Sequence, residues 1–410
     1  MRGRALNFSN RRRVSSMTAV GALTLMAACA PTPSDFREFE ENGVRVVETI
    51  GDGAWAELPP VVEFDLEQVY GADEFPTEAI LGNPSQLRVR GTTTGEVFVL
   101  DRRGNKLVAF AADGTLRWAA ERPGEGPGEF NGVNDVGFNQ HDNEVLVLNR
   151  SGLSIDFWSS TGDYLRSMPV PDEELRPTRI MSADQDYIRL SRFLGLELGV
   201  QVVRIDVDAP NSSFSWSVDV GDGFQVRPPS SVDVATHRDG AAVGSGIRYE
   251  IRLHDSNGAE IERWRRQVPY PVRPGTFDLG TIIGRHDFGH VRAPIALPGG
   301  YWLVHTAWRP NVTDPDALAL ELHEAAERDA NDWRVTFDVF NTDGRFLQSI
   351  EPGGPHEFGY VDRAITAYPI SLGMPIHAVV GVDDQVLLYT VAPEPFPQVR
   401  RYRMNFEPPG

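Results

Sequence analysis

Alternating hydrophobic and polar residues recur along the chain in pairs of short segments that are joined by a tight turn. The clearest examples are KLVAFAADGTLRWA (106–119), SIDFWSSTGDYLRSM (154–168), EIRLHDSNGAEIERW (250–264) and FDVFNTDGRFLQSI (337–350). Alternation with a period of two predicts strands, and a polar residue followed by glycine supplies the positive φ of a hairpin turn. We therefore predict a fold built from antiparallel hairpins.

The spacing of these turns indicates a repeating unit. The turn glycines are Gly114, Gly162, Gly258 and Gly344, which lie 48, 96 and 86 residues apart. Because 96 is twice 48, we expect a diverged hairpin near residue 210, where DAPNSS (208–213) separates two strand-like segments. A sequence period of about 40 to 50 residues is typical of the blades of a β-propeller.

The long last step contains extra sequence within the fifth unit. The segments 271–290 and 313–332 lie outside the hairpin pattern, and we predict that both are insertions. In the second, Asp314 can cap a helix that has Pro315 in its first turn. We therefore predict one short helix near residues 314–330.

Counting the units gives six blades. Five are centred on hairpins near residues 114, 162, 210, 258 and 344, and the last is formed by 376–390 and 398–404. The last unit is one strand short, so we expect VRVVETI (44–50) to complete it and close the ring, which removes exposed sheet edges. A seven-bladed ring, with residues 60–85 counted separately, is the alternative. The predicted fold is an all-β, six-bladed β-propeller over residues 44–407.

The junctions between blades also recur. RPGEGPGEF (122–130) is echoed by EPGGPHEF (351–358), and we interpret both as glycine-rich linkers whose closing phenylalanine packs between blades. The longer segment GEVFVLDRRGNKLVAFAADGTLRWAAERPGEGPGEF (95–130) resembles an NHL-type blade with its junction. The whole layout is similar to that of six-bladed propeller lipoproteins of Gram-negative bacteria. This resemblance implies the fold but no single activity, because one propeller scaffold serves lyases, lactonases, quinoproteins and pure binders.

Residues 1–28 have the organisation of a secretory signal peptide. Basic residues at 11–13 precede an apolar stretch from 14 to 26, and two alanines then lead to Cys29, the only cysteine. The apolar stretch is shorter than the ~20 residues that a transmembrane helix needs. The sequence MAAC (26–29) resembles the bacterial lipobox, which implies that Cys29 is acylated and that the chain is cleaved before it.

The residues that follow predict how the protein is held and where. Residues 30–43 are rich in proline and acidic residues, so we expect acylated Cys29 and a flexible tether to occupy 29–43. More than one acyl chain on Cys29 would hold the protein stably on a lipid bilayer. Ala30 follows the cysteine instead of aspartate, which in the lipoprotein family implies sorting to the outer membrane. We expect a lipid-anchored protein of the cell envelope, on the periplasmic or the surface face.

The net charge limits the partners that this protein can bind. The chain carries a net charge of −19, and removal of the five arginines in residues 1–28 changes it to −24. An acidic surface repels phosphate backbones, so nucleic acid is excluded as a partner. We expect a protein, a peptide or a glycan instead.

Candidate residues for catalysis or metal binding are sparse. The chain contains no Ser-His-Asp signature, nucleophile elbow, Walker loop, HExxH motif or EF-hand loop. In the first insertion, His286 and His290 have the spacing of two metal ligands on a helix, and Asp287 could provide a third. The glycines around them argue against a helix, so we favour a polar binding loop over one face of the propeller.

Two acidic residues are candidates for binding in the central channel. Asp135 and Asp233 each lie shortly after a junction, at the position expected for an inner strand. We predict that they form a pair of channel-lining residues. Carboxylates that are satisfied within their own strands are the alternative interpretation.

These patterns favour a non-enzymatic function, in which an anchored extracytoplasmic propeller acts as a binding or scaffold module. We expect no cofactor and no metal. The alternative is a metal-assisted lyase or hydrolase with its site in the central channel, where Ca²⁺ or Zn²⁺ would be held by His286 and His290 or by other histidines. The dispersed histidines are His141, His237, His305 and His377.

Overall fold

In the computed structural model, residues Phe36–Gly410 form one compact unit. The residues that it describes are 36–71, 81–83, 86–171, 176–193, 200–209, 213–218, 232–237, 240–245, 249–267, 290–291, 294–308, 334–351, 377–380, 385–392 and 397–409. Within these ranges, no helix is both long enough and apolar enough to cross a membrane. The predicted helix near 314–330 and most of the insertion 271–290 lie outside the described residues.

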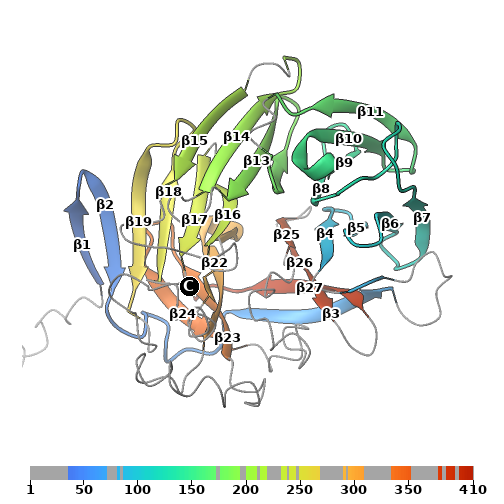
Figure 1. The fold of residues 1–410 in the computed structure, drawn as a ribbon. Helices are drawn as coiled ribbons and strands as arrows, with labels where there is room; N and C mark the ends of the chain where they lie inside the picture. The colour runs from blue at the N-terminus through green and yellow to red at the C-terminus, as the bar shows by residue number, and fades with distance from the viewer. Residues whose placement is uncertain are drawn as a thin grey trace, which may run out of the picture. The chain divides into compact units, whose positions relative to one another are not determined.

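Six β-sheets make up the fold, and Figure 1 shows them arranged around a common centre. Blade one contains β4 (Leu87–Gly91), β5 (Val97–Asp101), β6 (Lys106–Phe110) and β7 (Leu116–Glu121), and blade two contains β8 (Asp135–Asn139), β9 (Glu144–Asn149), β10 (Ser154–Ser159) and β11 (Tyr164–Pro169). Blade three contains β12 (Arg179–Ala183), β13 (Tyr187–Phe193), β14 (Val200–Asp206) and β15 (Ser213–Val218).

The other three blades carry additions to this pattern. Blade four contains β16 (Val232–His237), β17 (Gly240–Ser245), β18 (Glu250–His254) and β19 (Glu260–Arg266), and it is extended by β2 (Val44–Thr49) and β1 (Phe36–Glu41). Blade five contains β20 (His290–Val291), β21 (Ile295–Ala296), β22 (Trp302–Trp308), β23 (Arg334–Phe340) and β24 (Phe346–Ile350). Blade six contains β25 (His377–Val380), β26 (Val386–Ala392), β27 (Gln398–Phe406) and β3 (Val62–Tyr70).

The first strands of the blades surround the centre. Strand β4 contacts β8, β8 contacts β12, β12 contacts β16, and β16 contacts β20. Blades five and six share a core cluster that contains Phe337 and Tyr402, and strand β25 of the last blade contacts β4 of the first, so the series returns to its start. We call the region around these first strands the hub, and the outermost strands of the blades the rim.

The burial pattern changes from the middle of a blade to its rim. In blade one, every residue of β5 and β6 is buried, whereas the rim strand β7 alternates between exposed and partly buried residues. A strand that is covered on both faces reads as a continuous apolar run, and a strand with one wet face alternates. The hydrophobic core is therefore divided among the spaces between blades, as where Phe98 of blade one shares a cluster with Val145 and Trp158 of blade two.

Tryptophans on the rim strands of blades one, three and four pack against the hairpin turn of the next blade. A Cβ atom added to Gly162 would lie 2.8 Å from the Trp118 ring of the preceding blade, and Gly162 has φ +95°. Gly258 contacts Trp216 in the same way, and Gly344 contacts Trp264. Only glycine fits these turns, because both the positive φ and the close indole exclude a side chain.

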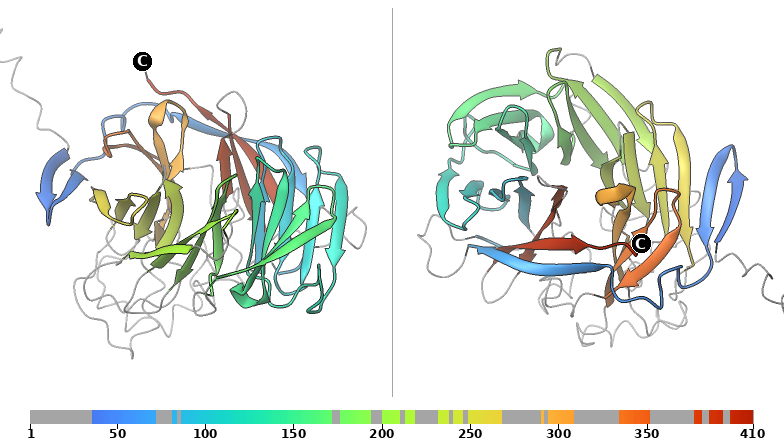
Figure 2. Two further views of the ribbon diagram at one scale, coloured as in Figure 1. Left: turned by 90° about the horizontal axis from the view of Figure 1, so that it is seen from above. Right: turned by 180° about the vertical axis from the view of Figure 1, so that it is seen from behind.

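The ring is closed by β3, which differs from the predicted closing strand. Strand β3 pairs antiparallel with β27, so an N-terminal segment does complete the last blade, and Figure 2 shows the two strands side by side. The prediction that residues 44–50 would do this is wrong, because β2 pairs in parallel with β19 of blade four. The alternative of seven blades is also wrong, since part of the segment 60–85 forms β3 within blade six. The diverged hairpin near residue 210 is confirmed by the antiparallel pairing of β14 with β15.

A compact set of contacts seals the closed ring between blades six and one. Arg401 of β27 donates hydrogen bonds to the Tyr70 hydroxyl (2.9 Å) and to the carbonyls of Gly95 (3.1 Å) and Ala112 (3.1 Å). The Tyr70 hydroxyl in turn donates to the Gly95 carbonyl at 2.9 Å. Burial raises the pKa of Tyr70 to about 12, so this hydroxyl stays protonated as the donor.

Candidate functional site

The start of blade two places Asp135 at the hub. Its side chain is buried, and its Oδ2 accepts a hydrogen bond from the backbone N–H of Ile180 in β12 at 2.8 Å. The first strand of a blade has no neighbour on its central side, so its backbone groups need other partners. Asp135 provides one across the space between two blades, which agrees with the interpretation of a satisfied inner carboxylate.

Arg90 of β4 joins the first strands of four blades. Its Nε donates to the Val136 carbonyl at 3.1 Å, and its Nη2 donates to the Ile180 carbonyl at 2.7 Å. Its Nη1 donates to Nδ1 of His377 at 3.3 Å, and the nearest Asp135 oxygen lies 3.9 Å from Nη2. Burial lowers the pKa of Arg90, and the charge of Asp135 opposes this effect. The arginine therefore acts as a tie between blades one, two, three and six.

His377 is the only one of the dispersed histidines for which the structure describes a side-chain contact with Arg90. Burial and then the positive charge of Arg90 hold the pKa of His377 well below its usual value of 6.5, although the Gly91 backbone opposes the shift. A neutral imidazole presents a lone pair on one nitrogen, which is what the Arg90 N–H requires. His377 is thus engaged as a hydrogen-bond acceptor within the hub.

The other candidate histidines lie apart from this contact where the structure describes them. His141 is exposed in the turn after β8. His305 is buried in β22, which lies next to β20 in the sheet of blade five. His237 and Asp233 belong to β16, in which Asp233 pairs with Gly244 through the backbone, but neither side chain is described. The pairing of Asp135 with Asp233 across the channel therefore stays a prediction.

The candidate metal ligands in the first insertion are not placed by the structure. His286 and Asp287 lie outside the described residues, and His290 is described only as the first residue of β20, which pairs with Ala307. Among the side chains that are described, no three from histidine, cysteine, aspartate or glutamate gather as a metal site would require.

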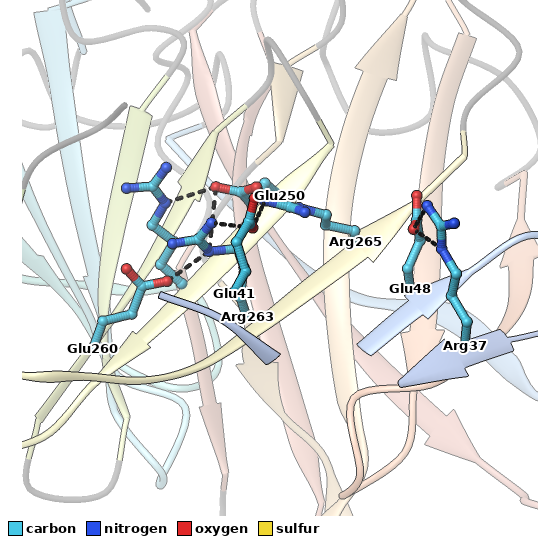
Figure 3. A network of polar contacts seen from close by, with 8 residues as sticks. Arg37, Glu41, Glu48, Glu250, Glu260, Arg263 and Arg265 are labelled. Carbon is cyan, nitrogen blue, oxygen red and sulfur yellow. Dashed lines mark hydrogen bonds and ion pairs between the residues drawn. The ribbon is translucent and has the colours of Figure 1, made fainter. Parts of the chain in front are cut away.

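A second polar cluster lies on the rim of blade four, and Figure 3 shows it from close by. Glu250 of β18 is buried, and its carboxylate faces Arg252 (2.6 Å), Arg265 (2.7 Å) and Arg263 (3.8 Å). Burial alone would raise the pKa of Glu250, but the three arginines outweigh it and lower the pKa overall. The carboxylate is therefore ionised and holds the side chains of two neighbouring strands together.

The same arginines fix the N-terminal hairpin to the blade. Glu41 of β1 accepts hydrogen bonds from Arg263 (2.9 Å) and Arg265 (2.6 Å), and Figure 3 shows it beside Glu250. Arg45 of β2 pairs with Glu262 of β19 at 2.6 Å. We call β1 and β2 together, residues 36–49, the N-terminal arm, and the charges around Glu250 and Glu41 the rim cluster.

Neither the Arg90 tie nor the rim cluster was found by sequence reasoning. The rim cluster had a signal, since the acidic FREFEE (36–41) complements the basic end of EIERWRR (260–266). Arg90 had none, because it belongs to an ordinary alternating strand and its acceptors lie in other blades. The predicted packing of Phe130 between blades is confirmed, since Phe130 is buried and its ring lies 5.4 Å from that of Trp158 in blade two. The same prediction for Phe358 lies outside the described residues.

The closed ring of six sheets defines the chain as a six-bladed β-propeller, and this predicted fold is confirmed. Residues 74–190 match the model of the DUF5128 family, which is described as a 6-bladed beta-propeller. No curated protein matches the sequence.

One solved structure extends the likeness in fold beyond the matched segment. A member of the DUF4221 family from Bacteroides vulgatus is similar with a TM-score of 0.53 at 11% identity, covering 84% of this chain and 98% of that one. A virginiamycin B lyase from Staphylococcus aureus has a TM-score of 0.42 at 10% identity, with 83% of this chain and 99% of that chain covered. At such identities the likeness concerns the fold alone.

Proposed function

We propose that the protein is a lipid-anchored, extracytoplasmic β-propeller that acts as a binding or scaffold module for a protein, a peptide or a glycan. The observation that carries this proposal is the Arg90 tie. Three ionisable groups of the described hub, Arg90, His377 and Asp135, contact each other or the backbone of neighbouring blades. Groups used in this way stiffen a platform, whereas acid–base catalysis needs a group that is free to exchange protons with a substrate.

The anchor in this proposal is Cys29, and the location is the outer membrane. Support comes from the residues around Cys29, which combine a signal-peptide pattern with a lipobox. The strong negative charge argues against nucleic acid as a partner and favours a partner with a neutral or basic surface.

The anchor is tested by expressing the full chain in a Gram-negative host. We expect the mass of the N-terminal peptide to show an acylated Cys29 as the first residue, and the protein to fractionate with the outer membrane. Cys29→Ala should lose both the acyl mass and the membrane fraction. An unmodified Cys29 in a correctly exported protein would refute the anchor.

Binding and catalysis are separated by metal analysis of the purified protein. We expect a preparation without stoichiometric Zn²⁺ or Ca²⁺, whose thermal stability does not change when a chelator is added. Stoichiometric metal that disappears in the His286→Ala and His290→Ala variants would contradict the binding proposal and favour the metal-assisted lyase or hydrolase.

A further inference from the structure

We infer that the rim of blade four is the surface that the protein turns towards the lipid bilayer. This inference rests on the proposed acylation of Cys29 and adds the orientation that the anchor imposes. Its first basis is the length of chain between the anchor and the folded unit. Phe36, where β1 begins, is the seventh residue after Cys29.

Chain geometry turns this short spacing into a limit on distance. A fully extended chain advances by roughly 3.3 to 3.6 Å per residue, so seven residues reach at most about 25 Å. A tether extending to Gly43, as the sequence suggested, would be twice as long and would reach about 50 Å. The structure shortens the tether because residues 36–41 already form β1. The start of the arm is thereby held close to the membrane surface.

The limit applies to the whole rim because the arm is firmly joined to it. Strand β2 pairs with β19 over five residues, and Val46 and Val47 are completely buried. The rim cluster adds the ion pairs of Glu41 and Arg45 with blade four. An arm that is packed and paired in this way does not act as an extra length of tether.

The chain after the arm is also fixed, on the neighbouring blade five. Gln348 of β24 donates hydrogen bonds to the carbonyls of Trp55 (3.0 Å), Leu58 (2.9 Å) and Pro59 (3.2 Å), and it accepts one from the Val61 N–H (3.1 Å). The arm is therefore held at both ends, by blade four and by the segment leading to β3.

The charges of the arm do not by themselves attract it to the bilayer. The arm has two arginines and four acidic residues, which gives it a net charge of −2. Arg37 pairs with Glu48, and Glu38 pairs with Arg45 at 2.7 Å. Such a surface does not attract anionic headgroups, so the tether and not a lipid-specific contact sets the orientation. With the rim of one blade towards the membrane, neither end of the hub is turned towards the bilayer.

Two labelled variants of the full, acylated chain test the orientation. Glu40→Cys places a thiol on the exposed face of β1, and Ala119→Cys places one on the exposed rim strand β7 of blade one. Cys29 is blocked by its acyl chain, so each variant has one free thiol for a donor fluorophore. The acceptor is a headgroup-labelled lipid in vesicles of phosphatidylethanolamine and phosphatidylglycerol. Because the tether reaches at most about 25 Å, we expect roughly twofold or more efficient energy transfer from position 40 than from 119.

A longer tether provides the matched control. Twenty Gly/Ser residues inserted between positions 35 and 36 add a flexible chain with a root-mean-square span of about 25 Å, and the difference between the two positions should disappear. Equal transfer from both positions in the vesicle-bound protein of native length would overturn the inferred orientation. A protein that does not bind vesicles and carries an unmodified Cys29 would instead overturn the proposed anchor.

Discussion

The hub and the rim of blade four both rely on arginine, but they use it differently. At the hub, Arg90 donates to neutral acceptors, namely two carbonyls and the neutral His377, and the nearest oxygen of Asp135 is 3.9 Å away. On the rim, three arginines surround the single buried carboxylate of Glu250. Hydrogen bonds to neutral groups depend on geometry, whereas ion pairs at a surface also depend on salt. The hub should therefore respond to the loss of one donor or to protonation of His377, and the rim to ionic strength.

The largest effect is expected for Arg90→Met, which removes the tie between four blades. The carbonyls of Val136 and Ile180 lose their Arg90 donors inside the hub, and we expect a loss of about 3 to 5 kcal/mol in the free energy of unfolding. Urea denaturation followed by tryptophan fluorescence measures it. Arg166→Met is the control. Exposed Arg166 of the rim strand β11 pairs with Glu144 and lies over the Phe157 ring at 3.9 Å, so its loss should cost about 1 kcal/mol. Equal losses in the two variants would remove the distinction between the arginine of the hub and the arginines of the rim.

The second effect is expected for Glu250→Gln, which leaves three arginines without their shared carboxylate. We expect the free energy of unfolding to fall by about 2 to 3 kcal/mol, because charge-assisted hydrogen bonds are lost while the guanidinium groups stay close together. The same denaturation experiment checks this value. Raising the salt concentration to 1 M should recover part of the loss by screening the repulsion. A loss that does not change with salt would show that the rim cluster behaves like the hub.

The third effect is a dependence of stability on pH that originates at the hub. The pKa of His377 in the folded protein lies well below 6.5, so the unfolded chain takes up its proton first as the pH falls. Stability contributed by neutral His377 is therefore complete above pH 6.5 and decreases as the pH falls below that value. His377→Gln keeps an acceptor for Arg90 and should flatten this decrease between pH 6.5 and the acidic range where carboxylates titrate.

His254 provides the control for this pH experiment. Its pKa is also lowered by burial, but by less, and its ring contacts the Gly258 carbonyl in a turn of blade four. His254→Gln should therefore change the pH profile less than His377→Gln does. Thermal melts at intervals between pH 5 and 7.5 measure both variants. If neither variant changes the profile, the hub is not the origin of the pH dependence.

The smallest effect is expected for Glu41→Gln, which weakens the hold of the rim cluster on the N-terminal arm. Glu41 is partly exposed, so we expect about 0.5 to 1 kcal/mol at low salt and less at 1 M salt. Hydrogen exchange of the β2 amides reports this change locally, since those amides pair with β19. Unchanged exchange in β2 would mean that Val46 and Val47 hold the arm without help from the ion pairs.

The parts of the fold that were predicted correctly are those that local pattern determines. The hairpins and their glycines could be predicted because alternation and a positive φ are properties of adjacent residues. The closing strand could not, because the segments 44–50 and 62–70 both contain strand-like sequence, and nothing local says which sheet a strand joins. Parallel pairing of β2 with β19 connects residues more than 200 positions apart, as the contact of Arg45 with Glu262 illustrates.

The candidate site shows the same limit at the level of single residues. Asp135 was recognised from its place after a junction, and the structure puts it at the hub as expected for an inner strand. Its partner is the backbone N–H of Ile180, 45 residues away, and Arg90 reaches carbonyls 46 and 90 residues away. Backbone groups carry no residue-specific signal in a sequence, so contacts of this kind become visible only in the folded chain.

The path of the N-terminal segment also has a consequence for the time at which the ring can form during biosynthesis. Strand β3 is made early, but its partner β27 is made last, and Tyr70 and Arg401 are 331 residues apart. Early blades can form their hairpins as the chain emerges, while β3 stays an unpaired strand until the C-terminus arrives. Long-range pairing of this kind slows folding and exposes an edge to aggregation. A chaperone that shields residues 62–70 until the final blade is complete would therefore protect the growing chain from aggregation.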